Sequence, residues 1–471
     1  MLVERYRPLG GIASLWLALT LAPEFARGET LADAMLSAAE HHPALAAQRA
    51  RLSAAREDVT IARAGYFPKL HANADATRSN TPPGSLPASA NPPDPRFKSY
   101  SYGLSAEQPL FDGLKTVHAV DEATEATRAG EQDLRKFEQA TLGEAVTAYL
   151  DLLRDLTIVQ LREHSVAQLE RELSASRSRL ENGDATRTDV AQSAARLSTA
   201  IGNHAVARGN EVATFETFRH AVGRPPSSLQ PAPLPAGFPS TLDQALAIAT
   251  VEDPSLIAAT HRLEASRLAT RKIAAEALPR VSMHADYSRA VYDSASLGTA
   301  NDASVGVRVV VPLFDGGETS ARMRQSYFLE ASRDQELRDA RSRSRSNVAA
   351  IWARLDAARR QVVATRAAVE ANRTALSGVR EERKFSQRTT LDVLNSEQEV
   401  TETLVRLAQA EHEVLQLAYN LMQAIGRLSL DDIVTTPRST ATDQTRRDKL
   451  PPVIGSTAAT VPSGWRTTIT K

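Results

Sequence analysis

The sequence predicts a fold of long α-helices and short β-strands, arranged in a plan that occurs twice along the chain. The first observation is an internal duplication, because one spacing of 211 residues separates Pro43 from Pro254 and Pro68 from Pro279. The second is a change of hydrophobic period inside each copy, from helical spacing to strict alternation. The third is a pair of proline-free helical stretches. At about 1.5 Å per residue each would extend about 100 Å, more than a compact domain holds.

The two copies differ in length at one place only. Beyond the strands the spacing falls to 203 residues, from Pro109 to Pro312 and from Gly223 to Gly426. The difference of eight residues lies between the two strands of each copy, where the first copy is rich in proline. This segment is therefore predicted to be a loop, because proline-rich sequence forms neither helix nor strand.

Composition excludes several classes of protein. The 471 residues carry 56 basic and 56 acidic side chains, so the basic excess of a nucleic-acid-binding protein is absent. Aromatic residues make up only 5%, which suits helices packed through small side chains. The chain has no cysteine, which excludes disulfides, thiolate metal sites, cysteine nucleophiles and a lipidated cysteine anchor.

Residues 1–28 have the pattern of an export signal peptide. Arg5 and Arg7 precede a short apolar stretch at 12–22, and small residues stand just before Glu29. The stretch is shorter than the roughly 20 residues that span a bilayer. We expect the mature chain to begin near Glu29; a buried N-terminal helix is the alternative.

The first structural repeat is predicted at 29–226. It contains a helix, strands at about 69–78 and 99–108, and a long helical hairpin at 113–222. A proline-rich linker at 227–240 leads to the second repeat at 241–430. That repeat has strands at about 280–289 and 303–312 and a helical hairpin at 316–425. Residues 431–471 show no period and are predicted to form a flexible tail.

The four strands have the length of transmembrane strands. About ten residues cross an outer membrane at a tilt, and each strand is apolar with a few tyrosines on one face and polar on the other. Four strands cannot close a barrel around a lumen, so a barrel would need strands from several chains. A small soluble sheet that caps a helical rod is the alternative.

A repeated junction, Pro-Leu-Phe-Asp-Gly, links each strand pair to its long hairpin. Proline lacks the N–H group that continues a strand ladder, and aspartate can cap the helix that follows. Asp before Gly at a helix start favours capping over acid catalysis. The predicted junction residues are Pro109, Asp112 and Gly113, and Pro312, Asp315 and Gly316.

This duplicated order of motifs resembles the TolC family of outer-membrane efflux and secretion channels. The resemblance covers about Leu31 to Leu430. It is carried by the segments 108–113 and 311–317, the turns 182–190 and 388–394, and the helix ends 222–224 and 425–427.

The resemblance implies a homotrimer in the outer membrane of a Gram-negative cell. Three chains would form a 12-stranded transmembrane β-barrel, in contact with outer-membrane lipid, continued by an α-helical coiled-coil barrel in the periplasm. The implied function is the exit duct of a tripartite export system, with a periplasmic adaptor and an inner-membrane transporter. That transporter would be of the ABC or the proton-driven type. The absence of a lipidated cysteine favours the secretion and general-efflux branch, which contains the type I secretion channels, over the lipidated drug-efflux branch.

The resemblance also assigns residues to the periplasmic end of the duct. Asp189 and Arg388 fall at positions that link neighbouring helices, and Asp392 falls on an acidic ring that faces the lumen. Two positions depart from the family pattern: Arg383 replaces a linking tyrosine and Asn395 replaces a second acidic residue. The alternative interpretation is that these are ordinary solvated charges on coiled-coil faces.

Other signals for chemistry are weak. His41 and His42 are adjacent on a helix and point apart, with no third metal ligand near them in the sequence. No nucleophile elbow, phosphate-binding loop or zinc helix motif occurs. We therefore expect no enzyme activity, cofactor or metal. The alternative function is a periplasmic coiled-coil scaffold or adaptor without a pore.

Overall fold

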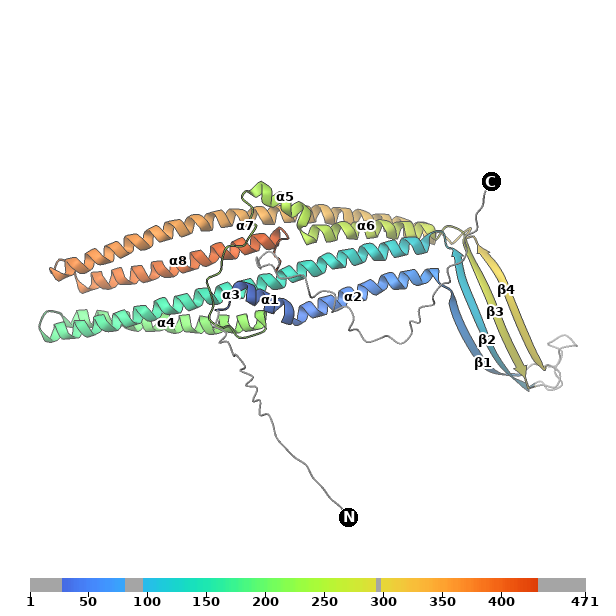
Figure 1. Ribbon diagram of the computed structural model, residues 1–471, viewed down its shortest axis with the longest axis horizontal. Coiled ribbons are helices and arrows are strands. Elements are labelled where there is room, and N and C mark those ends of the chain that lie inside the picture. Colours follow the sequence, from blue (N-terminus) through green and yellow to red (C-terminus); the bar gives the residue numbers. More distant parts are fainter. Residues whose placement is uncertain (1–27, 81–95, 294–297, 431–471) are drawn as a thin grey trace, which may run out of the picture. The chain divides into compact units, whose positions relative to one another are not determined.

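The computed structural model describes residues 28–80, 96–293 and 298–430, so the predicted signal peptide (except Gly28) and tail lie outside the described residues. Two copies of one element order occur (Figure 1). The first contains α1 (Leu31–His41), α2 (Pro43–Arg63), a 3-10 turn (Ala64–Tyr66), β1 (Lys69–Asn80), β2 (Arg96–Phe111), α3 (Lys115–Glu181) and α4 (Arg187–Val222). The second contains α5 (Leu242–Glu252), α6 (Pro254–Ala275), β3 (Arg280–Tyr292), β4 (Thr299–Val310), α7 (Glu318–Lys384) and α8 (Thr390–Ala424).

Each copy breaks its first helix in front of a proline. His42 and Asp253 adopt extended backbone conformations, and Pro43 and Pro254 begin the next helix. Proline is favoured at a first helical position because the N–H it lacks would have no partner there. His41 bonds the Ser37 carbonyl through its ring. Among the described residues there is no group of three or more potential metal ligands.

The four strands form one antiparallel sheet in the order β1-β2-β3-β4. The register aligns Ala72, Leu104, Tyr287 and Ala303 across the sheet. The next row towards the helices aligns Leu70 with three further small or aliphatic residues, Ala106, Ala285 and Val305. Alternation therefore places the apolar residues on one face of the sheet, as the sequence predicted.

The strand bounds differ from the predicted ones. The strand β2 runs through Pro109 to Phe111, with a register irregularity between them, whereas the prediction ended it at 108. Pro109 is tolerated because β1 begins opposite Glu107, so that only β3 pairs with β2 at this point. The strand β4 begins earlier than predicted, at Thr299, and ends at Val310, before Pro312.

At the junctions, the aspartates bind the first helical turn but do not occupy the N-cap position. The Asp112 carboxylate accepts a 2.8 Å hydrogen bond from the Thr116 N–H. The Asp315 carboxylate accepts from the N–H groups of Gly317 and Thr319, at 2.9 and 2.8 Å. The N-cap residues are instead Leu114 and Gly317. Each has a left-handed backbone conformation and directly follows a left-handed glycine, Gly113 or Gly316.

The long helices pack as two hairpins, α3 with α4 and α7 with α8, and α3 also contacts α8 (Figure 1). One large apolar core joins the hairpins to α1 and α5, and its largest fully buried side chains include Tyr149, Phe218 and Tyr419. None of the helices described here has the length and apolar character of a membrane-spanning helix.

Two buried tyrosines hold the segment that joins the copies. The Tyr149 hydroxyl donates to the Gln230 carbonyl at 2.6 Å and accepts from the Gln230 N–H at 3.0 Å. The Tyr419 hydroxyl donates to the Pro233 carbonyl at 3.0 Å. Burial raises the pKa of each phenol to about 12. The predicted linker is therefore anchored in the core by hydrogen bonds.

Candidate functional site at the helical hairpin tips

The two hairpins end in turns of the same geometry. In the first turn, the Asp184 N–H donates to the Arg179 carbonyl at 2.8 Å, and Gly183 has a left-handed backbone with φ of 82°. In the second, the Gln387 N–H donates to the Glu382 carbonyl at 3.0 Å. Ser386 takes the left-handed position there, with φ of 60°, although it is not glycine. The duplication therefore preserves the turn even where the residue changes.

Asp189 and Asp392 have the same role in these turns. Each closes a capping box with the N-cap threonine three residues earlier: the carboxylate accepts the threonine N–H at 2.9 Å. The threonine hydroxyl in turn accepts the aspartate N–H, at 3.1 and 3.2 Å. Backbone hydrogen bonds from Thr186 and Thr389 lower the pKa of the two carboxyls below the ordinary 3.8. Both aspartates thus stabilise the start of the returning helix.

Arg388 bonds locally. Its Nε donates to Glu382 at 2.7 Å, within the turn itself, and both side chains are about half exposed. This hydrogen bond raises the pKa of Arg388. Within the described residues of one chain, Asp189 and Arg388 do not bond to each other or across the hairpins.

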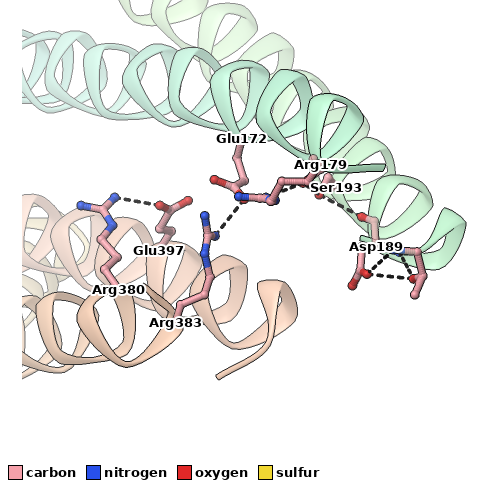
Figure 2. A network of polar contacts seen from close by, with 9 residues as sticks. Glu172, Arg179, Asp189, Ser193, Arg380, Arg383 and Glu397 are labelled. Atoms are coloured by element: carbon pink, nitrogen blue, oxygen red, sulfur yellow. Dashed lines mark hydrogen bonds and ion pairs between the residues drawn. The ribbon is translucent and has the colours of Figure 1, made fainter. Parts of the chain in front are cut away.

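Arg383 connects the two hairpins. Its guanidinium donates to Glu172 Oε1 at 2.8 Å, and Arg179 donates to the same oxygen at 2.6 Å (Figure 2). Glu172 and Arg179 belong to α3, whereas Arg383 belongs to α7. The side chains of Glu172 and Arg383 are 14% and 25% exposed, so water only partly screens this ion pair.

A second ion pair close by stays inside one hairpin. Arg380 of α7 donates to Glu397 of α8 at 2.7 Å (Figure 2). Within the first hairpin, the buried hydroxyls of Ser176 and Ser193 lie 3.3 Å apart and join α3 to α4. Of these contacts, only that of Arg383 would break if the two hairpins moved apart.

A polar hollow of about 1110 Å³ separates the tips. Asp189, Arg383 and Arg388 line it together with Glu172, although Asp189 and Arg388 belong to different hairpins. Asp392 is not among its lining residues. The structure thus brings three of the four predicted tip residues to the wall of one hollow.

Further contacts cross the hairpins farther from the turns. Arg196 of α4 donates to Asn395 of α8 at 2.8 Å, so the residue that departs from the acidic family pattern accepts a hydrogen bond from a cation. Arg162 of α3 binds both carboxylate oxygens of Glu402, at 2.6 and 3.1 Å. Between these contacts lies a small apolar cluster formed by Leu169, Ala200 and Leu394.

Sequence reasoning missed two features of the tips. The capping boxes have a sequence signal, a threonine followed three residues later by aspartate, which occurs at Thr186 and again at Thr389. The pairs of Glu172 with Arg383 and of Glu402 with Arg162 have no such signal, because each arginine lies far from its glutamate in the chain and helix packing alone brings them together.

Comparison with known proteins gives consistent matches across the chain. Residues 35–224 and 245–427 match the protein family described as outer membrane efflux protein, once for each structural repeat. The chain is 33% identical over 428 residues to the outer membrane efflux protein BepC of Brucella suis, covering 91% of this chain and 92% of BepC.

Two further matches extend the comparison. The chain is 26% identical to the alkaline protease secretion protein AprF of Pseudomonas aeruginosa, covering 85% of this chain and 84% of AprF. Among solved structures, a crystal structure of CusC superposes with a TM-score of 0.74 at 16% identity, covering 84% of this chain and 92% of that chain. At this identity the match to CusC shows a shared fold.

Proposed function

We propose that this chain, which belongs to the outer membrane efflux protein family, supplies one third of a trimeric duct that carries cargo out of the cell. Family membership confirms the resemblance to TolC channels and the outer-membrane location. It also makes the chain an efflux or secretion protein. The trimer, its partners and its cargo are the proposal.

The exposed apolar face of the sheet supports assembly most directly. Leu70, Leu104 and Val305 are 77%, 62% and 78% exposed in the single chain. The strands β1 and β4 each have one neighbour, so both edges of the sheet carry unpaired backbone groups. Three copies joined edge to edge would give twelve strands and leave no free edge, with the apolar face towards lipid.

The helical tips would form the periplasmic entrance. In a trimer the hairpins α3–α4 and α7–α8 would supply twelve long helices, and the contact of Arg383 with Glu172 would hold the two hairpins of each chain together. Asp189, Arg388 and Asp392 bond locally within one chain. We propose that their effect on closure operates between neighbouring protomers.

The partners would be a periplasmic adaptor that docks on the tips and an inner-membrane transporter of the ABC or proton-driven type. BepC is named an efflux protein and AprF a protease secretion protein, so we propose either small molecules or a secreted protein as the cargo of this chain. We propose transport without catalysis. Cells that lack the chain would show increased drug sensitivity in the first case and loss of a secreted protein in the second.

Reconstitution of the purified mature protein in planar bilayers tests the proposal. We expect trimers extracted from outer membranes, with stepwise ionic conductance. The chain has no cysteine, so single cysteines placed in β1 and β4 would cross-link only neighbouring copies. A freely soluble monomer that leaves bilayers silent would contradict the duct and favour the non-pore scaffold.

A further inference from the structure

The apolar face of the sheet carries three cations towards its loop end, two in one row and one nearer the helices. Following alternate residues of β1 away from the helices gives Leu70, Ala72, Ala74, Ala76 and then Arg78. The register places Lys98 of β2 directly opposite Arg78. On β3, Arg289 lies on the same face, opposite Tyr102. All three cationic side chains are exposed.

These cations have no protein partner among the described residues. Like charges directly opposite each other on neighbouring strands are destabilising, so the pairing of Arg78 with Lys98 is unfavourable by itself. The backbone N–H of Asp293 donates to the Lys98 carbonyl, but the Asp293 carboxylate makes no ion pair with Lys98. Arg289 has only neutral neighbours in register, Tyr102 and Asn301.

The polar face of the same sheet is arranged differently. Lys69 lies directly opposite Glu107, which pairs opposite charges. Arg308 lies opposite Ser282. Among the described strand residues, a like-charge pair in register therefore occurs on the apolar face and not on the polar face. The apolar face is the one proposed to contact lipid and not water.

The cations lie at the depth of a membrane interface. From Val281 to Val291, ten residues at about 3.4 Å each and a tilt of about 40° give a height of about 25 Å, which is that of the apolar band of outer-membrane barrels. Tyr100 lies opposite Val291, which marks this limit, and Lys98 is one row farther from the helices than Tyr100. Arg289 is one row inside this limit, and its long side chain can extend to the interface. Exposed tyrosines at 100, 102 and 287 lie beside the cations, as in an interfacial aromatic girdle.

We propose that Arg78, Lys98 and Arg289 form a binding site for the phosphate groups of a lipid in the outer leaflet. The inference rests on the proposed membrane role of the sheet, since the loop end of the strands then faces the exterior. A phosphate between Arg78 and Lys98 would replace their repulsion with two charge-assisted contacts. Arginine binds phosphate through two parallel N–H groups, and the three cations favour a headgroup whose phosphate charge is not already balanced by its own ammonium group.

Lipid binding to the intact trimer in detergent tests this site. The probes are lipopolysaccharide, the same glycolipid with its phosphates removed, phosphatidylcholine and inorganic phosphate, with bound lipid measured by native mass spectrometry. The test variant is Arg78→Gln/Lys98→Gln. The matched control is Lys69→Gln/Arg308→Gln, which removes one lysine and one arginine from the opposite face. Adding Arg289→Gln to the test variant removes the third cation of the site.

We expect the wild type to prefer the phosphorylated glycolipid over the other three probes. At about 1 kcal/mol per interfacial cation, each substitution should weaken binding about fivefold, and the control should bind like the wild type. Equal binding by the test variant and the wild type, or equal loss in the control, would overturn the site. So would binding of free phosphate alone. Conductance of the same samples separates the two proposals: a conducting wild type without lipid preference refutes only the lipid site, whereas a silent one refutes the duct.

Discussion

The same four long helices meet in two very different ways along their length. In the core near the middle of α3, Tyr149, Phe218 and Tyr419 have at most 2% of their surface exposed and pack with many aliphatic side chains. Towards the tips the buried apolar cluster is small, formed by Leu169, Ala200 and Leu394, and ion pairs and capping boxes add polar contacts.

Because of this difference, the core is expected to stay fixed, whereas the tips are able to open. Burial of a large apolar side chain stabilises by about 1.5–3 kcal/mol, whereas a partly solvated ion pair contributes about 0.2–1 kcal/mol. Movement of the hairpins at the tips therefore costs little, while movement in the core would expose aromatic side chains. The hydrogen bonds that the two core tyrosines make to the linker add to this asymmetry.

The largest expected effect is in the core. Phe218→Ala should lower the free energy of unfolding by about 3–5 kcal/mol, because the ring is fully buried and leaves a cavity. The matched control is Phe215→Ala on the same helix, where the ring is 36% exposed. Thermal unfolding of the intact protein followed by circular dichroism would measure both. Equal loss in the two variants would contradict the assignment of the core.

A pair of glycines compares the two regions at one backbone conformation. Gly426 and Gly183 both have φ near 80°, so alanine at either position is strained by about 1 kcal/mol. At Gly426 an added Cβ would also overlap the Glu252 carbonyl oxygen, whereas at Gly183 nothing lies within 4 Å. Gly426→Ala should therefore lower the unfolding midpoint clearly more than Gly183→Ala. Similar midpoints would show that the helix end near Glu252 is able to shift.

The sequence predicted the elements of this fold better than the contacts between them. Period and proline placement located each strand and helix, because both signals are local to the chain. The strand limits were less accurate: β2 passes through Pro109 because β1 has ended there, and this depends on the neighbouring strand.

At the tips the local and non-local contributions are mixed. The caps formed by Asp189 and Asp392 follow from a four-residue pattern, a threonine three residues before an aspartate, which is local to the sequence. The contact of Arg383 with Glu172 depends on how α3 lies against α7, which no segment of sequence specifies alone. The linking role predicted for Asp189 and Arg388 stays a prediction, since the part of one chain that the structure describes contains no such link.

A smaller effect on stability but a clear effect on transport is expected at the cross-hairpin contact. Glu172→Gln should raise the open fraction of reconstituted channels about tenfold, because three copies each lose about 0.5 kcal/mol of closure. Arg380→Gln is the control, since it breaks an ion pair of the same kind inside one hairpin. Single-channel recording distinguishes the two. An equal rise in both variants would indicate general softening of the tips instead of a latch.

The smallest expected effect is a difference in how the stability of the two regions depends on pH. The carboxyl pKa values of Asp189 and Asp392 are lowered by the backbone N–H groups of Thr186 and Thr389, so the folded state binds fewer protons than the unfolded state. The stability they add is complete above about pH 4 and is lost as pH falls through the lowered values. For Tyr149 the sign is opposite, because its pKa is raised to about 12 and its contribution is lost only in strong alkali.

Hydrogen exchange measures this difference segment by segment. After correction for the intrinsic rates, exchange in the first turns of α4 and α8 should accelerate below pH 4, while the core around Tyr149 keeps its protection. Asp189→Asn/Asp392→Asn should remove the acid response of these turns, because asparagine does not titrate. Acid-induced loss of protection that starts in the core would reverse the order of stability proposed for the two regions. It would then place the movable part of the chain away from the tips.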